Sequence, residues 1–288
     1  MVVIELTGGL GNQLFQYAFG RSLTIVDSNK FFFDVEKYKW DNLRGFSLNQ
    51  YQIPYKIVDQ QDLMWLHKKP FLGQFINRYK PYYKLNLIEE KTFEYDRNFN
   101  LFNLKLCFYK GYWQSEHYFL EIRKTILQDL KISTPLSSET QFYLSKIKKN
   151  KNSVSIHIRR GDYVTDLKTN DFHGALDLSY YYKSIEFFRS KFENPTFFIF
   201  SDDKEFVKKT FALESNFEFI QEVKLDYEEL FLMSQCENNI IANSSFSWWG
   251  AWLNENEHKI VVSPNNWFKN EAMQSQTKDL IPQKWIKI

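Results

Sequence analysis

Residues 153–162 read SVSIHIRRGD and combine a hydrophobic strand with a strongly cationic end. A β-branched residue occupies every second position of the first six, which predicts a buried β-strand. Arg159 and Arg160 follow it directly, and then a glycine and an aspartate. Ligands of open α/β sheets bind beyond the carboxyl ends of the strands, and the guanidinium fork suits phosphate. We therefore infer a diphosphate site. An equally supported alternative is that the two arginines only form ion pairs with acidic residues at the surface.

The composition indicates a globular protein without a nucleic-acid or metal site. The 288 residues suffice for one large or two ordinary domains, and 43% hydrophobic with 25% charged residues is ordinary. A net charge of +2 without a basic stripe argues against nucleic acid. The 2 cysteines and scattered histidines offer neither a disulfide framework nor a metal-ligand spacing. We expect no metal and no cofactor.

The cellular location is expected from what the sequence lacks. The N-terminus has no basic region followed by a long apolar run, so a signal peptide is not expected. No apolar stretch reaches the roughly 18 to 20 residues that a membrane span requires. We expect a cytoplasmic protein without a transmembrane segment, and peripheral association with the inner face of the membrane stays open.

The N-terminal region has the pattern of a strand, a glycine loop and a helix. A strand at 2–6 precedes GGLGNQ at 8–13, and a helical pattern covers 14–26. This layout brings backbone N–H groups close to a phosphate or a sugar. The third glycine of the dinucleotide fingerprint is missing, so we reject a NAD site. Asn12 at the helix start is either a ligand contact or a helix N-cap.

Strands and helices alternate regularly in the second half. The predicted strands cover 153–158, 196–200, 217–220, 238–242 and 259–262, and the helices cover 179–192, 204–211, 227–235 and 246–253. This alternation predicts a parallel, doubly wound α/β domain. The first half is less regular, with strands at 31–35 and 104–109 and helices at 59–67, 117–130 and 138–149.

Three domain segments follow from these patterns. A Lys-rich polar run near 146–152 suggests a boundary there. We expect an N-terminal Rossmann-like domain at 1–150 and a C-terminal one at 151–270. The tail at 271–288 is expected to pack back on the N-terminal domain.

Polar residues follow two further strands of the second half. Asp203 comes after the strand at 196–200, and its carboxylate could accept from the N1–H and amino group of guanine. Ser244, Ser245 and the N–H of Phe246 begin a helix and would form an anion site there. An N-cap is the equal alternative for the aspartate and for the serines. Together with the arginines, these strand ends predict a nucleoside diphosphate site that needs no metal.

Four segments resemble glycosyltransferase family 11, the α-1,2-fucosyltransferases. They are GGLGNQLFQYA at 8–18, HIRRGDYV at 157–164, FSDD at 200–203 and IANSSFSWWGAW at 241–252. GYWQ at 111–114 and FHG at 172–174 add to the resemblance, which runs to about residue 268. It implies a GT-B fold, which is an α/β fold of two facing Rossmann-like domains with the donor site in the cleft. It also implies GDP-β-L-fucose as the donor, inversion at the anomeric carbon and no metal.

The resemblance also implies roles for individual residues. Arg159 would hold the donor diphosphate and neutralise the departing GDP, and Arg160 would support the same loop. The remaining donor contacts would come from Asn12, His157, Asp203, Ser244, Ser245 and Phe246, and His173 would contact the acceptor. Asp162 is the expected general base, with Asp166 and Glu5 as competitors. An equal alternative for Asp162 is that it orients one of the two arginines.

The expected activity is transfer of L-fucose to the 2-hydroxyl of a terminal galactose-type sugar. The acceptor would be a galactose-containing oligosaccharide or a lipid-linked glycan in bacterial surface glycan synthesis. Residues 36–103 are expected to shape its pocket, although no motif identifies it. The alternatives are a GT-B glycosyltransferase with another nucleotide-sugar donor and a non-catalytic carbohydrate-binding protein rich in aromatic residues.

Overall fold

The computed structural model describes residues 1–41, 43–59, 87–99, 107–214 and 216–288. The chain forms two compact units, Met1–Ser133 and Thr134–Ile288. The boundary expected near residue 150 is therefore wrong. The helix α5 (Ser138–Lys149) belongs to the second unit because Tyr143 and Ile147 pack with buried side chains of that unit's sheet.

The first unit contains a parallel sheet with the order β3-β2-β1-β5-β4. Every pair of neighbouring strands in it is parallel. The strands are β1 (Val2–Glu5), β2 (Phe31–Asp34), β3 (Lys56–Ile57), β4 (Leu87–Glu89) and β5 (Cys107–Lys110). The two short strands β3 and β4 were not predicted. The order changes direction between β1 and β5, which is where ligands of such sheets bind.

The helix α1 (Leu10–Leu23) follows β1 and begins earlier than the pattern predicts. Its N-cap is Gly9, whose carbonyl accepts hydrogen bonds from the N–H groups of Asn12 and Gln13. The expected loop at 8–13 is therefore mostly the first helical turn. The N-cap alternative for Asn12 is wrong, because this residue lies inside the helix.

The remaining helices of the first unit are short. Instead of one helix over 117–130, the chain forms 3₁₀ turns at Glu116–Tyr118 and Leu120–Ile122 and then α4 (Arg123–Asp129). Residues 60–67 of the helix expected at 59–67, and residues 104–106 of the strand expected at 104–109, lie outside the described residues.

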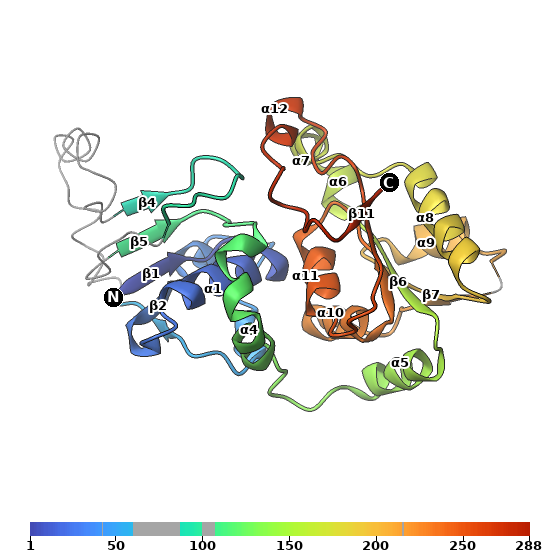
Figure 1. The fold of residues 1–288 in the computed structure, drawn as a ribbon, viewed down its shortest axis with the longest axis horizontal. Coiled ribbons are helices and arrows are strands. Elements are labelled where there is room, and N and C mark those ends of the chain that lie inside the picture. The colour runs from blue at the N-terminus through green and yellow to red at the C-terminus, as the bar shows by residue number, and fades with distance from the viewer. Residues whose placement is uncertain (42, 60–86, 100–106, 215) are drawn as a thin grey trace. The chain divides into compact units, whose positions relative to one another are not determined.

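The second unit contains a parallel sheet with the order β11-β10-β9-β6-β7-β8 (Figure 1). Its strands are β6 (Ser153–Ile158), β7 (Thr196–Ser201), β8 (Phe217–Phe219), β9 (Asn238–Ile240), β10 (Val261–Ser263) and β11 (Ile286–Lys287). The five predicted strands are all present. The order changes direction between β6 and β9, so their ends flank the point where ligands bind in this class of sheet.

The tail forms part of the second unit. Its strand β11 pairs in parallel with β10, matching Ile286 to Val262. The Trp248 indole donates to the carbonyl of Leu280 at 2.9 Å, and its ring lies 5.5 Å from that of Trp285. These contacts correct the expectation that the tail packs on the N-terminal domain.

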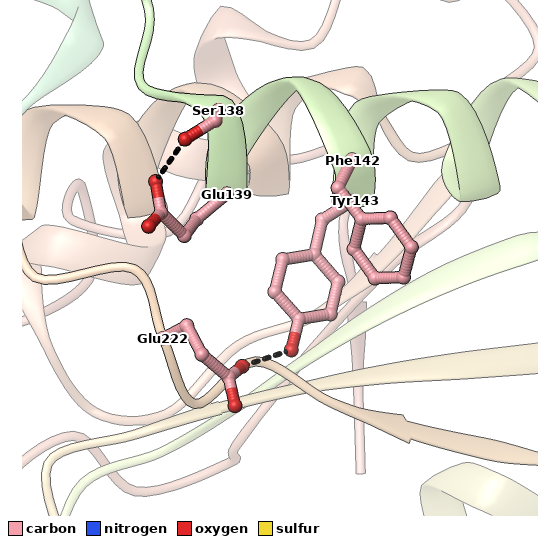
Figure 2. Close-up of a pocket in the computed structure, with 5 residues that line it drawn as sticks. All are labelled: Ser138, Glu139, Phe142, Tyr143 and Glu222. Atoms are coloured by element: carbon pink, nitrogen blue, oxygen red, sulfur yellow. Dashed lines mark hydrogen bonds between the residues drawn. The ribbon is translucent and has the colours of Figure 1, made fainter.

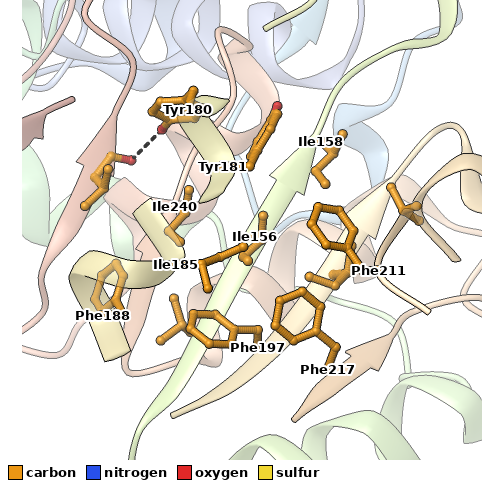
Figure 3. Close-up of a cluster of buried hydrophobic side chains, with 14 residues drawn as sticks. Ile156, Ile158, Tyr180, Tyr181, Ile185, Phe188, Phe197, Phe211, Phe217 and Ile240 are labelled. Atoms are coloured by element: carbon orange, nitrogen blue, oxygen red, sulfur yellow. Dashed lines mark hydrogen bonds between the residues drawn. The ribbon is translucent and has the colours of Figure 1, made fainter. Parts of the chain in front are cut away.

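Besides α5, the described residues of this unit form seven helices. They are α6 (Gly161–Thr165), α7 (Leu167–Phe172), α8 (Leu178–Lys191), α9 (Lys204–Thr210), α10 (Asp226–Gln235), α11 (Ser245–Leu253) and α12 (Glu271–Gln274). Of these, α8 and α9 pack in the core on one face of the sheet, and α10 packs with α5 in the core on the other. Figure 3 shows Ile185 and Phe188 of α8 packed against Ile156 of β6 and Phe197 of β7. Successive strand residues face opposite sides, and Phe198 accordingly belongs to the core beside α5 and α10.

Candidate functional site

The polar ends of β6, β7 and β9 lie at one edge of the second sheet. The three strands are neighbours and run in parallel. The structure therefore brings Arg159, Asp203 and Ser244 to the same edge, as the sequence predicts. The loop from Arg159 to Gly161 links β6 to α6 beside the change in strand order.

Asp202 holds the arginine loop in place. Its carboxylate forms an ion pair with Nη1 of Arg159 at 2.8 Å and accepts from the backbone N–H of Arg160 at 2.9 Å. A Cβ atom on Gly161 would lie 2.5 Å from Oδ2 of Asp202, so only glycine fits there without displacing the carboxylate. The role of Asp202 was not predicted, although the residue directly follows β7 (Thr196–Ser201).

Asp203 is the N-cap of α9, as the alternative interpretation of this residue predicts. Its Oδ1 accepts from the N–H of Phe206 at 3.1 Å, and its Oδ2 accepts from Nε of Arg160 at 3.2 Å. The Arg160 guanidinium lies 3.5 Å from the centre of the Phe206 ring, a cation–π geometry. Both arginines thus have a carboxylate partner, as the alternative interpretation requires. Such pairing also fixes the direction of a guanidinium.

A cavity of about 530 Å³ opens beside this loop. It is lined by Arg160, Gly161, Val164, Asp202, Asp203, Lys204 and Glu205. The ammonium of Lys204 donates to the carbonyls of Gln221 and Val223, and it lies 3.5 Å from the carboxylate of Glu229. Burial raises the pKa of Glu229 to about 7, against the opposing effect of the lysine. The cavity therefore has cationic and anionic groups in its wall.

His157 is buried on β6 and lies beside the first turn of α11. Its ring centre lies 5.5 Å from that of Phe246, and its Nδ1 has no hydrogen-bond partner. Burial lowers the pKa of His157 to about 4, although the nearby Asp202 acts in the opposite direction. The imidazole is therefore neutral at pH 7 and cannot add to the cationic charge of the loop.

The start of α11 lies at the end of β9. Ser244 is its N-cap and accepts from the N–H of Phe246, while Ser245 and Phe246 form its first turn. Asn243 is buried and donates to the carbonyls of His173, Gly174 and Trp267. It therefore ties the segments at 173–174 and 267 to this strand end.

His173 lies in an aromatic group. Its ring stacks on Tyr163 at 4.8 Å with an interplanar angle of 7°, and Phe172 and Phe268 contact it from other sides. Tyr163 also donates to the carbonyl of Asn243. The placement of His173 is thus fixed by packing, and its proposed acceptor contact stays a prediction.

The candidate bases differ in what the structure shows of them. Asp162 is in α6, and its side chain lies outside the described part of the structure. Asp166 is exposed. Glu5, in the first unit, forms an ion pair with Lys37 at 2.8 Å. The choice between them stays a prediction.

Asn12 lies in the first unit, beside the loop that follows β5. Its Oδ1 accepts from Nε2 of Gln114 at 2.9 Å. The buried Gln13 donates to the carbonyls of Gly8 and Gly45 and accepts from the N–H of Ser47. These hydrogen bonds hold the segment at residues 11–13 in place against the neighbouring backbone.

A second cavity, of about 390 Å³, lies beside α5 (Figure 2). Its polar groups bond to one another: Tyr143 donates to Glu222 at 2.6 Å, and Ser138 donates to Glu139 at 2.8 Å. No predicted site residue lines it.

Two further properties concern only the described residues. None of their helices is long and apolar enough to cross a membrane. Among them there is also no cluster of three or more histidine, cysteine, aspartate or glutamate residues that could hold a metal ion.

The fold defines the class of the protein. A solved structure of a mutant of Arabidopsis thaliana FUT1 in complex with GDP aligns with 98% of this chain and 74% of its own, with a TM-score of 0.50 and 10% identity. Two Rossmann-like α/β units, each with a parallel sheet, agree with the GT-B fold. The expected fold class is confirmed.

Sequence comparison defines the family. The sequence model of glycosyl transferase family 11 matches residues 1–288. An alpha-1,2-colitosyltransferase of Escherichia coli is 36% identical over 296 residues, which cover 100% of this chain and 99% of the relative. The O-antigen biosynthesis glycosyltransferase WbnK of Escherichia coli is 36% identical and covers 98% of this chain and 99% of its own. Human galactoside alpha-(1,2)-fucosyltransferase 1 is 24% identical, covering 64% of this chain and 52% of its own. The chain belongs to glycosyl transferase family 11 and is a glycosyltransferase.

Proposed function

We propose that this enzyme is an inverting α-1,2-fucosyltransferase. It moves L-fucose from GDP-β-L-fucose to the 2-hydroxyl of a terminal galactose-type sugar, on an oligosaccharide or a lipid-linked glycan, for bacterial surface glycan synthesis. The observation that carries the proposal is the arginine loop at the end of β6, fixed by Asp202 beside the change in strand order. The motif resemblance and the family's fucosyltransferase members support it.

The chemistry assigned to the loop follows from the transition state. The acceptor oxygen attacks the anomeric carbon, the bond from that carbon to the phosphate oxygen breaks, and its electron pair leaves with GDP. Glycosyl transfer passes through an oxocarbenium-like state, so negative charge grows on the diphosphate. Arg159 stabilises that charge from a fixed position, and Arg160 supports the same loop. The hydroxyl proton passes to a carboxylate, for which Asp162 is the first candidate.

The other donor contacts are assigned by chemistry. Asp203 and His157 would lie on the guanine side, and the N–H groups at the start of α11, with Ser244 and Ser245, would bind phosphate oxygens. Asn12 would reach the diphosphate or the sugar from the first unit. We place the reaction in the cytoplasm, with peripheral membrane contact if the acceptor is lipid-linked.

A second donor is favoured by a specific finding. The relative that matches all of this chain at 36% identity is a colitosyltransferase. Colitose is L-fucose without its 3-hydroxyl, so a pocket for one differs from a pocket for the other by a single polar contact. A site that hydrogen-bonds a hydroxyl discriminates strongly against a sugar that lacks it.

The donor is tested by direct competition. Purified enzyme is incubated with a β-galactoside and either GDP-fucose or the colitosyl donor, with and without a chelator, and GDP release is measured. We expect faster release with GDP-fucose, and no effect of the chelator. Release with the colitosyl donor alone would establish the second donor instead, and release with neither would refute both.

A further inference from the structure

The carboxyl edge of the first sheet holds two loops that flank its change in strand order. The glycine loop and first turn of α1 follow β1, and GYWQ at 111–114 follows β5. Nε2 of Gln114 donates to Oδ1 of Asn12 across this point at 2.9 Å. Contacts that hold the loop at 111–114 in place therefore also hold the side chain of Asn12 in place.

The loop at 111–114 has a backbone that needs support. Trp113 has a φ of 57°, in the left-handed region that bulky side chains disfavour. Its ring stacks on Phe19 at 4.1 Å. The side chain of Gln16 donates to the carbonyl of Gly111 and accepts from the N–H of Thr7, which ties this loop to the loop after β1. Such strained conformations persist only where surrounding contacts hold them.

The carboxylate of Glu90 supplies the closest support. Its Oε2 accepts from the N–H of Tyr112 at 2.7 Å, and its Oε1 accepts from the N–H of Trp113 at 2.9 Å. Its own N–H donates to the carbonyl of Lys110, so the residue is fixed to the end of β5. Both carboxylate oxygens are used, and charge-assisted bonds of this kind are stronger than neutral ones.

We propose that Glu90 is a positioning residue for glycosyl transfer. It fixes the backbone at Tyr112 and Trp113, which directs Gln114 toward Asn12 and holds Asn12 toward the donor. This inference rests on the proposed function, in which Asn12 contacts the donor sugar or diphosphate.

Because Glu90 can be protonated, the positioning of Asn12 should depend on pH. Burial raises the pKa of this carboxyl to about 7, although the two N–H groups act in the opposite direction. A protonated carboxyl has one oxygen that donates, and that oxygen no longer accepts well from a facing N–H. The neighbouring ionisable groups are Tyr112, whose pKa is itself raised by burial, and Glu5, Lys110 and Glu89. Positioning should therefore weaken as the pH falls through about 7.

The test compares Glu90→Gln with Glu89→Gln. Glu89 is the adjacent residue, and it makes an exposed ion pair with Lys110, which contributes little to stability. We expect Glu90→Gln to lower kcat about tenfold to a hundredfold, the range for a small misplacement, with an unchanged circular dichroism spectrum. Glu89→Gln should match the wild type. Equal kcat values for the two variants would overturn the inference.

Two readouts separate positioning from general stability. The fall in kcat below pH 7 should persist in the wild type and in Glu89→Gln and be absent in Glu90→Gln. The effect of Glu90→Gln should also shrink when Gln114→Ala is already present, because both act through one contact. An unchanged pH profile or fully additive effects would contradict the proposal.

A second variant covers the case in which Glu90→Gln does not fold. Glu90→Asp keeps the charge with a shorter reach, and we expect an intermediate kcat that still falls below pH 7; a wild-type kcat would overturn the inference. All ratios are measured with whichever nucleotide sugar the wild type turns over. If the wild type turns over another nucleotide sugar but not GDP-fucose, the proposed donor is refuted. The ratio of the kcat values of Glu90→Gln and the wild type can still be measured with that other sugar.

Discussion

Arg159 is the residue on which the proposed chemistry depends most. Replacing it by lysine keeps the charge but removes the planar fork that matches a diphosphate. We predict a fall in kcat of about a hundredfold to a thousandfold, the cost of removing one donor that stabilises transition-state charge. Steady-state kinetics with saturating donor measures this loss.

The control for this prediction is an arginine of the same unit in another place. Arg189 on α8 also forms ion pairs, with Glu186 and Glu214. Arg189→Lys should keep the wild-type kcat. If Arg159→Lys were as active as Arg189→Lys, the loop at the end of β6 would not bind the diphosphate.

His157 predicts a pH dependence of stability. Its pKa in the folded state is about 4, lowered by burial from 6.5, so above pH 6.5 it is neutral in both the folded and the unfolded state. Between these values the unfolded state binds more protons at this residue than the folded state does, so the contribution of His157 to the free energy of unfolding falls as the pH falls. The loss is at most about 3 kcal/mol. Urea unfolding at pH 7 and pH 5 measures it.

The matched variants are two histidine substitutions. His157→Gln removes this contribution, so between pH 7 and pH 5 it should lose less free energy of unfolding, or gain more, than the wild type. His258→Gln replaces an exposed histidine and should keep the wild-type change. If the change is the same in both variants, protonation of His157 is not its source.

Among the elements, the turn from β6 into α6 depends on the absence of a side chain at Gly161. In Gly161→Ala, the new Cβ would displace the Asp202 carboxylate from Arg159. We predict a fall in kcat of about tenfold or more, since the arginine is then misplaced. Gly45→Ala is the control, because nothing lies within 4 Å of a Cβ there. Equal kcat values would show that Asp202 does not position the loop.

The strands of the second unit could be predicted because their patterns are strong. β6 alternates apolar and polar residues, and it begins and ends at Ser153 and Ile158 as expected. Parallel strands end at one edge, so the meeting of three polar strand ends followed from the order of elements alone. The resemblance to family 11 was also confirmed by the comparisons.

Other features depend on contacts that a local pattern does not contain. The strands β3 and β4 have two and three residues and no apolar alternation. Which of two adjacent aspartates pairs with Arg159 depends on the turn after β7. The role of Glu90 could not be predicted from the sequence, because its partners are backbone N–H groups about twenty residues further along the chain. The placement of α5 depends on packing with the core of the second unit.

At the scale of the whole molecule, the tail is the clearest long-range feature. The chain leaves β10 and returns through Leu280 and Trp285 to pair β11 beside it (Figure 1). The last residues thus complete the same sheet that carries the arginine loop. Their contribution is structural, because they cover Trp248, a fully buried side chain of α11.

Trp285→Ala should therefore destabilise the second unit. It removes the ring that packs on Trp248 and weakens the attachment of β11, so we predict a loss of about 2 kcal/mol in the free energy of unfolding. Trp40→Ala is the control, because the Trp40 side chain is 81% exposed, and surface changes stay within about 0.5 kcal/mol. Urea unfolding of the full chain, followed by circular dichroism, compares the two. If both variants have the same urea midpoint, the tail does not stabilise the sheet. A strand that contributes to stability lowers the free energy of unfolding when its attachment is weakened.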